Sequence, residues 1–249
     1  IMKKLFLTAG VLALGFLQAQ HSEWGYQGAG SPEHWGEIEG AGKCGQSQKQ
    51  SPINIVTQKV KAGASMNALK FNYNLGDVKD IVDNGHSLQF DFKEGSYITY
   101  EGKKYNLYQF HAHEESEHTI DGIRYPLELH FVHIAEDKSS VLVIGVMVKD
   151  GEENSYFEKL KVFKTLAKNG KEETDIAFNP EQMYPKNKNF YTYQGSLTTP
   201  PCSDNVTWVV FKDPITMSES EIEDIEKHLP KSNNRPVQPL NGRTVSVTK

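Results

Sequence analysis

The sequence has little cysteine, no excess of basic residues and no long apolar run. The last two absences each exclude a class of protein. Lys and Arg number 27 against 32 Asp and Glu, for a formal net charge of −5, so the concentrated basic surface of a nucleic-acid-binding protein is missing. The longest apolar run, of about 13 residues, is shorter than the roughly 20 that span a bilayer as a helix. We therefore expect no nucleic-acid partner and no membrane span. No repeat or low-complexity tract is present either, which favours one globular domain.

The apolar run lies near the start of the sequence. Lys3 and Lys4 precede it, Leu5–Leu17 forms it, and Ala19 follows as a small residue where a signal peptidase could cut. This order predicts a signal peptide over residues 1–19 and a secreted mature domain over residues 20–249. A membrane anchor is the alternative, although the run is short for it.

The two cysteines, Cys44 and Cys202, lie far apart in the sequence. In an oxidising compartment, a single pair of cysteines is most simply one disulfide. The pair would join the N-terminal segment to the C-terminal third of the chain. Two free buried thiols are the alternative interpretation.

Aromatic and β-branched residues gather in short segments separated by turn residues, which predicts strands. The predicted strands are Leu69–Tyr73, Ser87–Phe92, Tyr97–Tyr100, Tyr105–His113, Leu127–Ile134, Val141–Val148 and Val206–Phe211. Two segments have helical spacing of apolar residues: Ser155–Ala167, and Glu219–His228 with Ser218 as its N-cap. The sequence thus predicts a single domain of the α+β class with peripheral helices.

Histidines concentrate in two of the predicted strands. His111 and His113 are two residues apart, so their side chains project from the same face of a strand. His130, on the next long predicted strand, can bring a third imidazole to them. Three neutral imidazoles with an open fourth position are typical of a catalytic zinc site, because structural zinc is usually closed by four ligands, often thiolates.

A His-x-His pair alone is weak evidence for a metal, so the surrounding side chains matter. Metal-bound imidazoles usually donate their second N–H to an oxygen. Gln109 shares a strand face with His111, and Glu128 shares one with His130, so both are candidates to accept such bonds. We interpret His118 and His133 as hydrogen-bonded structural histidines, since His133 points to the face opposite His130.

Several motifs in a fixed order resemble the α-class carbonic anhydrases, particularly their secreted bacterial members. They cover essentially the whole chain after the predicted signal peptide, and the matching segments are Trp24–Tyr26, Pro32–Trp35, Gln50–Asn54, Asn84–His86, Gln109–His113, Ser116–Thr119, Glu128–His133, Gly195–Pro201 and Asn234–Gln238. The resemblance implies a large, mostly antiparallel central β-sheet. It also implies a secreted or periplasmic location in a bacterium.

The resemblance further implies an activity: reversible hydration of carbon dioxide to bicarbonate and a proton, by attack of hydroxide bound to Zn²⁺. His111, His113 and His130 would hold the zinc, while Thr198, bonded to Glu117, would orient the hydroxide. The other implied roles are proton shuttling by His86, ordering of the water chain by Tyr26 and Asn84, and contact with the substrate by Val132, Val143, Leu197, Thr199 and Trp208.

Four positions depart from the family pattern: Ala112 stands between the first two ligands, Glu114 and Glu115 follow them, and Lys49 precedes the Gln50–Asn54 motif. We expect no effect of Lys49 on catalysis. Ala112 points away from the ligand face, so we expect it to affect packing, whereas inward carboxylates could perturb the zinc site. Sulfonamides or anions are expected as inhibitors, and assembly into a homodimer is left open.

Other function classes compete with this interpretation. A related binding protein without catalysis is the main one, but such proteins typically lack a zinc histidine, and all three are present. A zinc hydrolase would more often contain His-Glu-x-x-His on a helix, and the sequence has no such string. Esterase activity is a plausible secondary activity of the same site.

Overall fold

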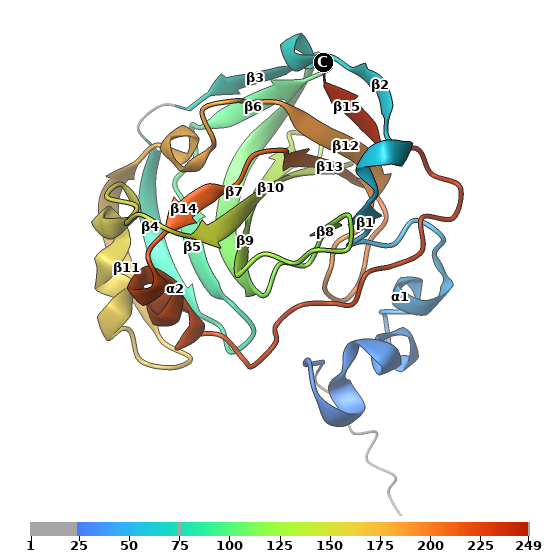
Figure 1. The fold of residues 1–249 in the computed structure, drawn as a ribbon. Helices are drawn as coiled ribbons and strands as arrows, with labels where there is room; N and C mark the ends of the chain where they lie inside the picture. The colour runs from blue at the N-terminus through green and yellow to red at the C-terminus, as the bar shows by residue number, and fades with distance from the viewer. Residues whose placement is uncertain (1–23, 74–75, 249) are drawn as a thin grey trace, which may run out of the picture.

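One large sheet forms the centre of the molecule in the computed structural model, which describes residues 24–73 and 76–248 (Figure 1). The predicted signal peptide lies outside the described residues. The sheet has 13 strands in the order β11-β4-β5-β7-β9-β10-β13-β12-β15-β2, with β14, β3 and β6 paired beside this path. Two further strands, β1 (Asn54–Ile55) and β8 (Thr119–Ile120), form a small separate sheet.

The strands of the large sheet range from short edge segments to the long central pair. They are β2 (Lys61–Ala64), β3 (Leu69–Asn72), β4 (Gly76–Asp83), β5 (Leu88–Phe92), β6 (Tyr97–Tyr100), β7 (Lys103–Glu114), β9 (Leu127–Ala135), β10 (Val141–Asp150), β11 (Lys171–Phe178), β12 (Phe190–Gly195), β13 (Val206–Phe211), β14 (Ile215–Met217) and β15 (Ser246–Thr248). Only β10–β13, β10–β14 and β15–β2 pair in parallel among the described strands of this sheet. The prediction of a single α+β domain with a mostly antiparallel sheet is confirmed.

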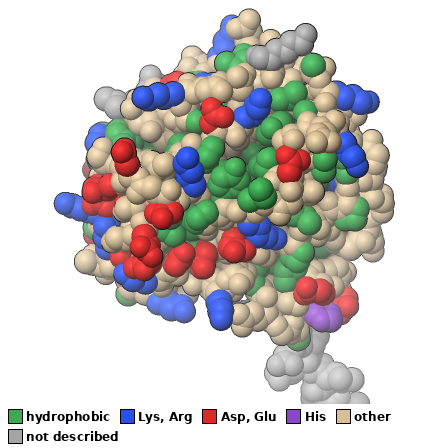
Figure 2. Space-filling view, viewed as in Figure 1, with side chains coloured by type: hydrophobic (Ala, Val, Ile, Leu, Met, Phe, Trp, Pro, Cys, Tyr) green, Lys and Arg blue, Asp and Glu red, His purple; other side chains and the backbone are tan. Residues whose placement is uncertain are grey.

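Helices are short and lie at the edges of the sheet (Figure 1). They are the α-helices α1 (Lys43–Gln46) and α2 (Glu219–Glu226) and the 3₁₀ helices η1 (Gly28–Gly30), η2 (Pro32–Glu37), η3 (Thr57–Lys59), η4 (Met66–Ala68), η5 (Phe157–Thr165) and η6 (Pro180–Met183). In the part of the chain that is described, no helix is both long and apolar enough to cross a membrane. On the face drawn in Figure 2, acidic and basic side chains are interspersed.

The two central strands separate the hydrophobic core from the face that carries the histidines. β7 and β9 are antiparallel, with Phe110 opposite Phe131 and His111 opposite His130. The two phenyl rings are buried and stack with centroids 4.9 Å apart. Because successive side chains of a strand alternate between faces, the histidines lie on the other side of the sheet. One face thus stabilises the fold, and the other builds a site.

All seven predicted strands exist, with end points that differ by up to two residues, but several strands were not predicted. β4 and β11 were missed because they carry many charged residues, and in each the pairing register shifts at a bulge. β12 is rich in tyrosine and phenylalanine but was also absent from the prediction. The short strands β1, β2, β8, β14 and β15 have too few residues for a periodic pattern.

The predicted helix over Ser155–Ala167 is a 3₁₀ helix, η5, over Phe157–Thr165. Phe157, Leu160 and Phe163 are its buried residues, and their spacing of three matches the 3₁₀ repeat rather than the α repeat. The second predicted helix is confirmed as α2. Ser218 caps it in a capping box with Glu221, as the preceding serine suggested.

Cys44 and Cys202 form a disulfide across a sequence separation of 158 residues, which confirms the predicted pair. Both half-cystines are buried against Trp35 and Ala41. The N–H of Cys202 donates to the carbonyl of Thr199 at 2.9 Å. The bond therefore fixes the N-terminal segment to the loop that carries Thr198 and Thr199.

Replacement of both cysteines by serine should lower the free energy of unfolding by about 2–5 kcal/mol, because a long closed loop restricts the unfolded chain. Urea unfolding of the parent and the variant measures this change. A reducing agent should shift the parent's midpoint towards that of the variant and leave the variant's own midpoint unchanged. Equal midpoints for the two proteins under oxidising conditions would contradict this account.

Candidate active site

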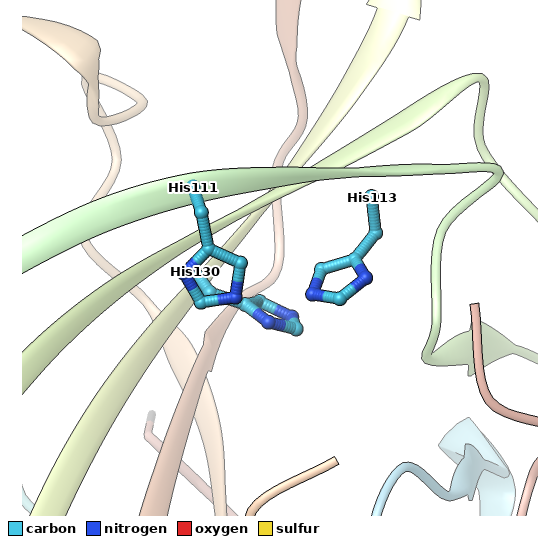
Figure 3. Close-up of side chains that lie close together, drawn as sticks. All are labelled: His111, His113 and His130. Atoms are coloured by element: carbon cyan, nitrogen blue, oxygen red, sulfur yellow. The ribbon is translucent and has the colours of Figure 1, made fainter. Parts of the chain in front are cut away.

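Three imidazoles converge beside the central strands (Figure 3). His111 and His113 extend from β7, and His130 comes from β9, paired directly with His111. Their ring centroids are 4.6–5.3 Å apart. One nitrogen from each ring lies within 4.8 Å of the other two. The strand pairing thus brings together the three histidines that the sequence singled out.

The outward nitrogens of His111 and His113 are engaged by oxygen acceptors. His111 Nδ1 lies 2.9 Å from Oε1 of Gln109, the contact expected from their shared strand face. His113 Nδ1 lies 2.6 Å from the backbone carbonyl of Asn233. A hydrogen bond at Nδ1 fixes the ring and leaves Nε2 available as an acceptor or ligand.

His130 is oriented the other way round. Its Nε2 lies 3.0 Å from Oε1 of Glu128, so its Nδ1 is the nitrogen turned toward the other two rings. Glu128 is fully buried and also contacts His118, whose backbone N–H donates to Oε2 at 2.8 Å and whose Nδ1 lies 2.8 Å from Oε1. Glu128 therefore lies next to the outer nitrogen of His130, as the sequence predicted.

Burial keeps the three imidazoles neutral. It lowers the pKa of His111 well below its ordinary value and that of His113 to about 4. Burial also lowers the pKa of His130, against the opposing effect of Glu128. Although burial alone would raise the pKa of Glu128, His118 and His130 hold it well below its usual range. Neutral imidazoles are the form that binds a metal ion.

The donor set fits zinc. Nε2 of His113 is buried and has no hydrogen-bond partner among the described residues, which is costly unless a ligand satisfies it. Three nitrogen donors of neutral imidazoles, each with its other nitrogen within 3.0 Å of an oxygen atom, are the set expected for a catalytic zinc ion. Thiolates are absent here, because both cysteines are in the disulfide.

A buried carboxylate lies next to the imidazoles. Glu117 Oε2 is 3.5 Å from Nε2 of His113 and 3.8 Å from Nδ1 of His130. Oε1 accepts the backbone N–H of Arg235 at 2.8 Å. Burial raises the pKa of Glu117 to about 7, while His130, that N–H and the Thr198 hydroxyl act to lower it. A cation nearby would favour the carboxylate further.

An apolar cavity of about 260 Å³ opens beside His111 and His130. Its lining includes every residue that the resemblance assigned to substrate contact: Val132, Val143, Leu197, Thr199 and Trp208, together with Thr198. Tyr108, which is 54% exposed, also lines this cavity. The cavity offers a small uncharged molecule an apolar surface next to the three nitrogens.

A second, smaller cavity of about 130 Å³ adjoins the first. Tyr26, Asn84 and His86 line it together with His111, His113 and Thr199. The His86 ring stacks on Trp24, with centroids 3.8 Å apart and planes 15° apart. The residues expected to move a proton therefore share one cavity that reaches two of the imidazoles.

The residues that depart from the family pattern differ in their burial. Ala112 is buried in the core on the opposite face of β7. Burial raises the pKa of Glu114, and Glu226 and Glu115 add to this effect. Glu115 is exposed. His118 and His133 have the structural bonds predicted for them, to Tyr193 and Tyr73 respectively.

Several residues of the site were missed in the sequence, and Asn233 and Trp24 are two that contact its histidines. Asn233 follows His113 by 120 residues, yet its carbonyl orients that ring. Trp24 was part of a matched motif, but its stacking on His86 depends on the placement of the N-terminal segment. No local signal identifies either contact, because both join parts of the chain that are distant in sequence.

Several known proteins that are similar to this chain in sequence and fold are carbonic anhydrases. A family model described as eukaryotic-type carbonic anhydrase matches residues 30–249. A carbonic anhydrase of Neisseria gonorrhoeae is 39% identical over 228 residues, covering 90% of this chain and 88% of the relative. One of Klebsiella pneumoniae is 37% identical over 252 residues, covering 98% of this chain and 99% of the relative.

A solved structure agrees. The α-carbonic anhydrase of Thermovibrio ammonificans, in complex with the inhibitor sulfanilamide, superposes with a TM-score of 0.85 at 39% identity and covers 90% of this chain and 98% of that one. Because the family model and these relatives extend over nearly the whole described chain and the fold is shared, the chain belongs to the eukaryotic-type (α) carbonic anhydrase family of enzymes.

Proposed function

We propose that the chain catalyses the reversible hydration of carbon dioxide at a zinc ion held by His111, His113 and His130. The observation that carries this proposal is the orientation of the three rings. Each is neutral, each has one nitrogen beside an oxygen acceptor, and the remaining nitrogens face one another. They do so beside an apolar cavity suited to an uncharged substrate.

Zinc, when bound, lowers the pKa of a coordinated water from 15.7 to about 7, the value known for carbonic anhydrases, and so supplies hydroxide at neutral pH. The protein's part is to hold and orient the reactants. Val143 and Trp208 are almost fully buried and exclude water from the cavity wall. Carbon dioxide carries no charge and accepts only weak hydrogen bonds, so an apolar wall is sufficient to bind it.

Thr198 and Glu117 orient the attacking oxygen in this proposal. If the Glu117 carboxylate accepts the hydroxyl proton of Thr198, the Thr198 oxygen can only accept a further hydrogen bond. It then accepts the remaining proton of the attacking oxygen and directs a lone pair toward the carbon of the substrate. The bond from Arg235 N–H to Glu117 holds the carboxylate in this role.

His86 exports the proton that hydration releases. An imidazole with an ordinary pKa near 6.5 gains and loses a proton readily near neutral pH. His86 lines the same small cavity as Tyr26 and Asn84, whose polar groups can order water between it and the imidazoles.

The direct test is a carbon dioxide hydration assay on the mature protein. Activity should be lost on removal of metal with a chelator and recovered when zinc is restored. A related protein that binds ligands without catalysis, the main alternative, would show no hydration with zinc bound.

His86→Ala should lower kcat in weakly buffered solution by about 100-fold, at the lower end of the range of a positioned acid–base group. The value of kcat/KM should stay nearly constant, because it reports attack on carbon dioxide before the proton is exported. Steady-state hydration kinetics with and without added imidazole measure both, and imidazole should restore kcat. Equal losses in kcat and kcat/KM, or no change in either, would contradict the assignment.

We also propose that the mature enzyme works outside the cytoplasm, where its disulfide can form. Sulfonamides are proposed as inhibitors, since a similar structure was solved with sulfanilamide. Anions are proposed to compete at the same site.

A further inference from the structure

A buried histidine outside the active site contacts the base of the turn that carries His86. His228 lies just after α2, and its Nδ1 is 3.3 Å from Oδ2 of Asp83, the last residue of β4. Asp83 is 1% exposed and His228 is 8% exposed. A buried carboxylate is costly unless it is paired, so this contact is more than an incidental surface pair.

Asp83 is also fastened to the turn that follows it. Its Oδ1 accepts the backbone N–H of Gly85 at 3.1 Å. Within the turn, Oδ1 of Asn84 accepts the N–H groups of His86 and Ser87 at 2.9 and 2.8 Å. The Asp83 carboxylate therefore links His228 on one side to the backbone that positions His86 on the other.

The loop after η5 also contacts Asp83 and the turn that follows it. The N–H of Asp83 donates to the carbonyl of Gly170 at 2.9 Å. Gly85 has φ +80°, a backbone conformation in which any residue with a side chain is strained. Phe163 of η5 packs edge-on against the His228 ring, with centroids 5.8 Å apart.

We propose that His228 is a positioning residue for proton transfer: through Asp83 it fixes the turn of residues 84–87 and thereby the His86 imidazole. This inference rests on the proposed function of His86 as the proton shuttle. His228 is absent from the lining of both active-site cavities, so it acts on the reaction only through the turn. A positioning effect of this kind matters because a displacement of about 1 Å can cost on the order of 100-fold in rate.

The test compares two replacements of His228. His228→Leu removes the donor to Asp83 while filling much of the space. His228→Asn keeps an N–H donor near the position of Nδ1. For His228→Leu we expect kcat in weak buffer to fall by roughly 3- to 10-fold. This loss is smaller than that from removing the acid–base group itself, which is about 100-fold or greater. We expect kcat/KM to stay the same, imidazole to restore kcat, and His228→Asn to retain most of the parent's kcat.

A matched control separates positioning from general stability. Ile225→Val shortens a fully buried side chain of α2 that carries no polar group to bond Asp83. It should lower Tm and leave kcat unchanged. If His228→Leu lowers Tm but keeps the parent's kcat in weak buffer, the inference is wrong. If His228→Leu does not fold, Asp83→Ala takes its place. This variant should lower kcat in weak buffer by the same factor and leave kcat/KM unchanged. An unchanged kcat for Asp83→Ala would also overturn the inference.

Combination with His86→Ala distinguishes failure of this inference from failure of the proposed function. In the His86→Ala background, His228→Leu should cause no further loss of kcat, because there is no imidazole left to position. If His86→Ala lowers kcat but His228→Leu and Asp83→Ala do not, only the present inference fails. If His86→Ala itself leaves kcat unchanged, the shuttle assignment fails and this inference fails with it.

Discussion

Each of His111→Ala, His113→Ala and His130→Ala is expected to lower zinc content and to reduce carbon dioxide hydration by more than about 100-fold. Loss of an outer hydrogen-bond partner alone typically costs about 10- to 100-fold in metal affinity or activity, and loss of a ligand removes a bond to the metal itself. With only two imidazoles left, the site has too few protein ligands to hold the ion. Metal analysis of purified protein, together with hydration kinetics, measures both effects.

The fold should survive these replacements. The three side chains lie on the face of β7 and β9 opposite Phe110 and Phe131, so the aromatic core is unchanged. Far-ultraviolet circular dichroism should therefore match the parent. His34→Ala is the matched control, because His34 is an exposed histidine in η2, outside both cavities. Stoichiometric zinc and normal hydration in any ligand variant would remove that residue from the proposed set.

The metal-binding residues could be predicted from sequence because they depend on local order and on one strand pairing. Spacing by two fixes His111 and His113 on one face, and the same alternation places Gln109 and Glu128. The pairing of His111 with His130 was the only tertiary step, and it joins two long strands with strong patterns. Resemblance to a family then supplied the roles of Thr198, Glu117 and His86.

The remainder depended on contacts that no local pattern encodes. β4 contains several charged residues and was missed, yet it ends at Asp83, which supports the turn of His86. Asn233 acts through a backbone carbonyl, so its side-chain type gave no indication of its bond to His113. The 3₁₀ form of η5 reflects packing at every third residue, whereas the sequence spacing also fitted an α-helix.

Thr198→Ala should retain zinc, but its rate of carbon dioxide hydration should fall on the order of 100-fold. The reason is that the attacking oxygen is no longer held in line with the substrate. Glu117→Gln should have a similar effect for a different reason. Its amide oxygen can still accept the N–H of Arg235, but its amide group can donate to Thr198. Thr198 would then direct its own proton at the attacking oxygen rather than accept one.

Glu221→Gln is the matched control for Glu117→Gln. Glu221 is also buried and also accepts a backbone N–H, from Asn154, but it lies in the capping box of α2. Its replacement should lower Tm and leave hydration kinetics unchanged, which separates loss of a buried carboxylate from loss of orientation. Zinc content close to that of the parent, with kcat/KM reduced in both Thr198→Ala and Glu117→Gln, supports the relay. Parent-like turnover in both variants would show that the attacking oxygen is oriented by other groups.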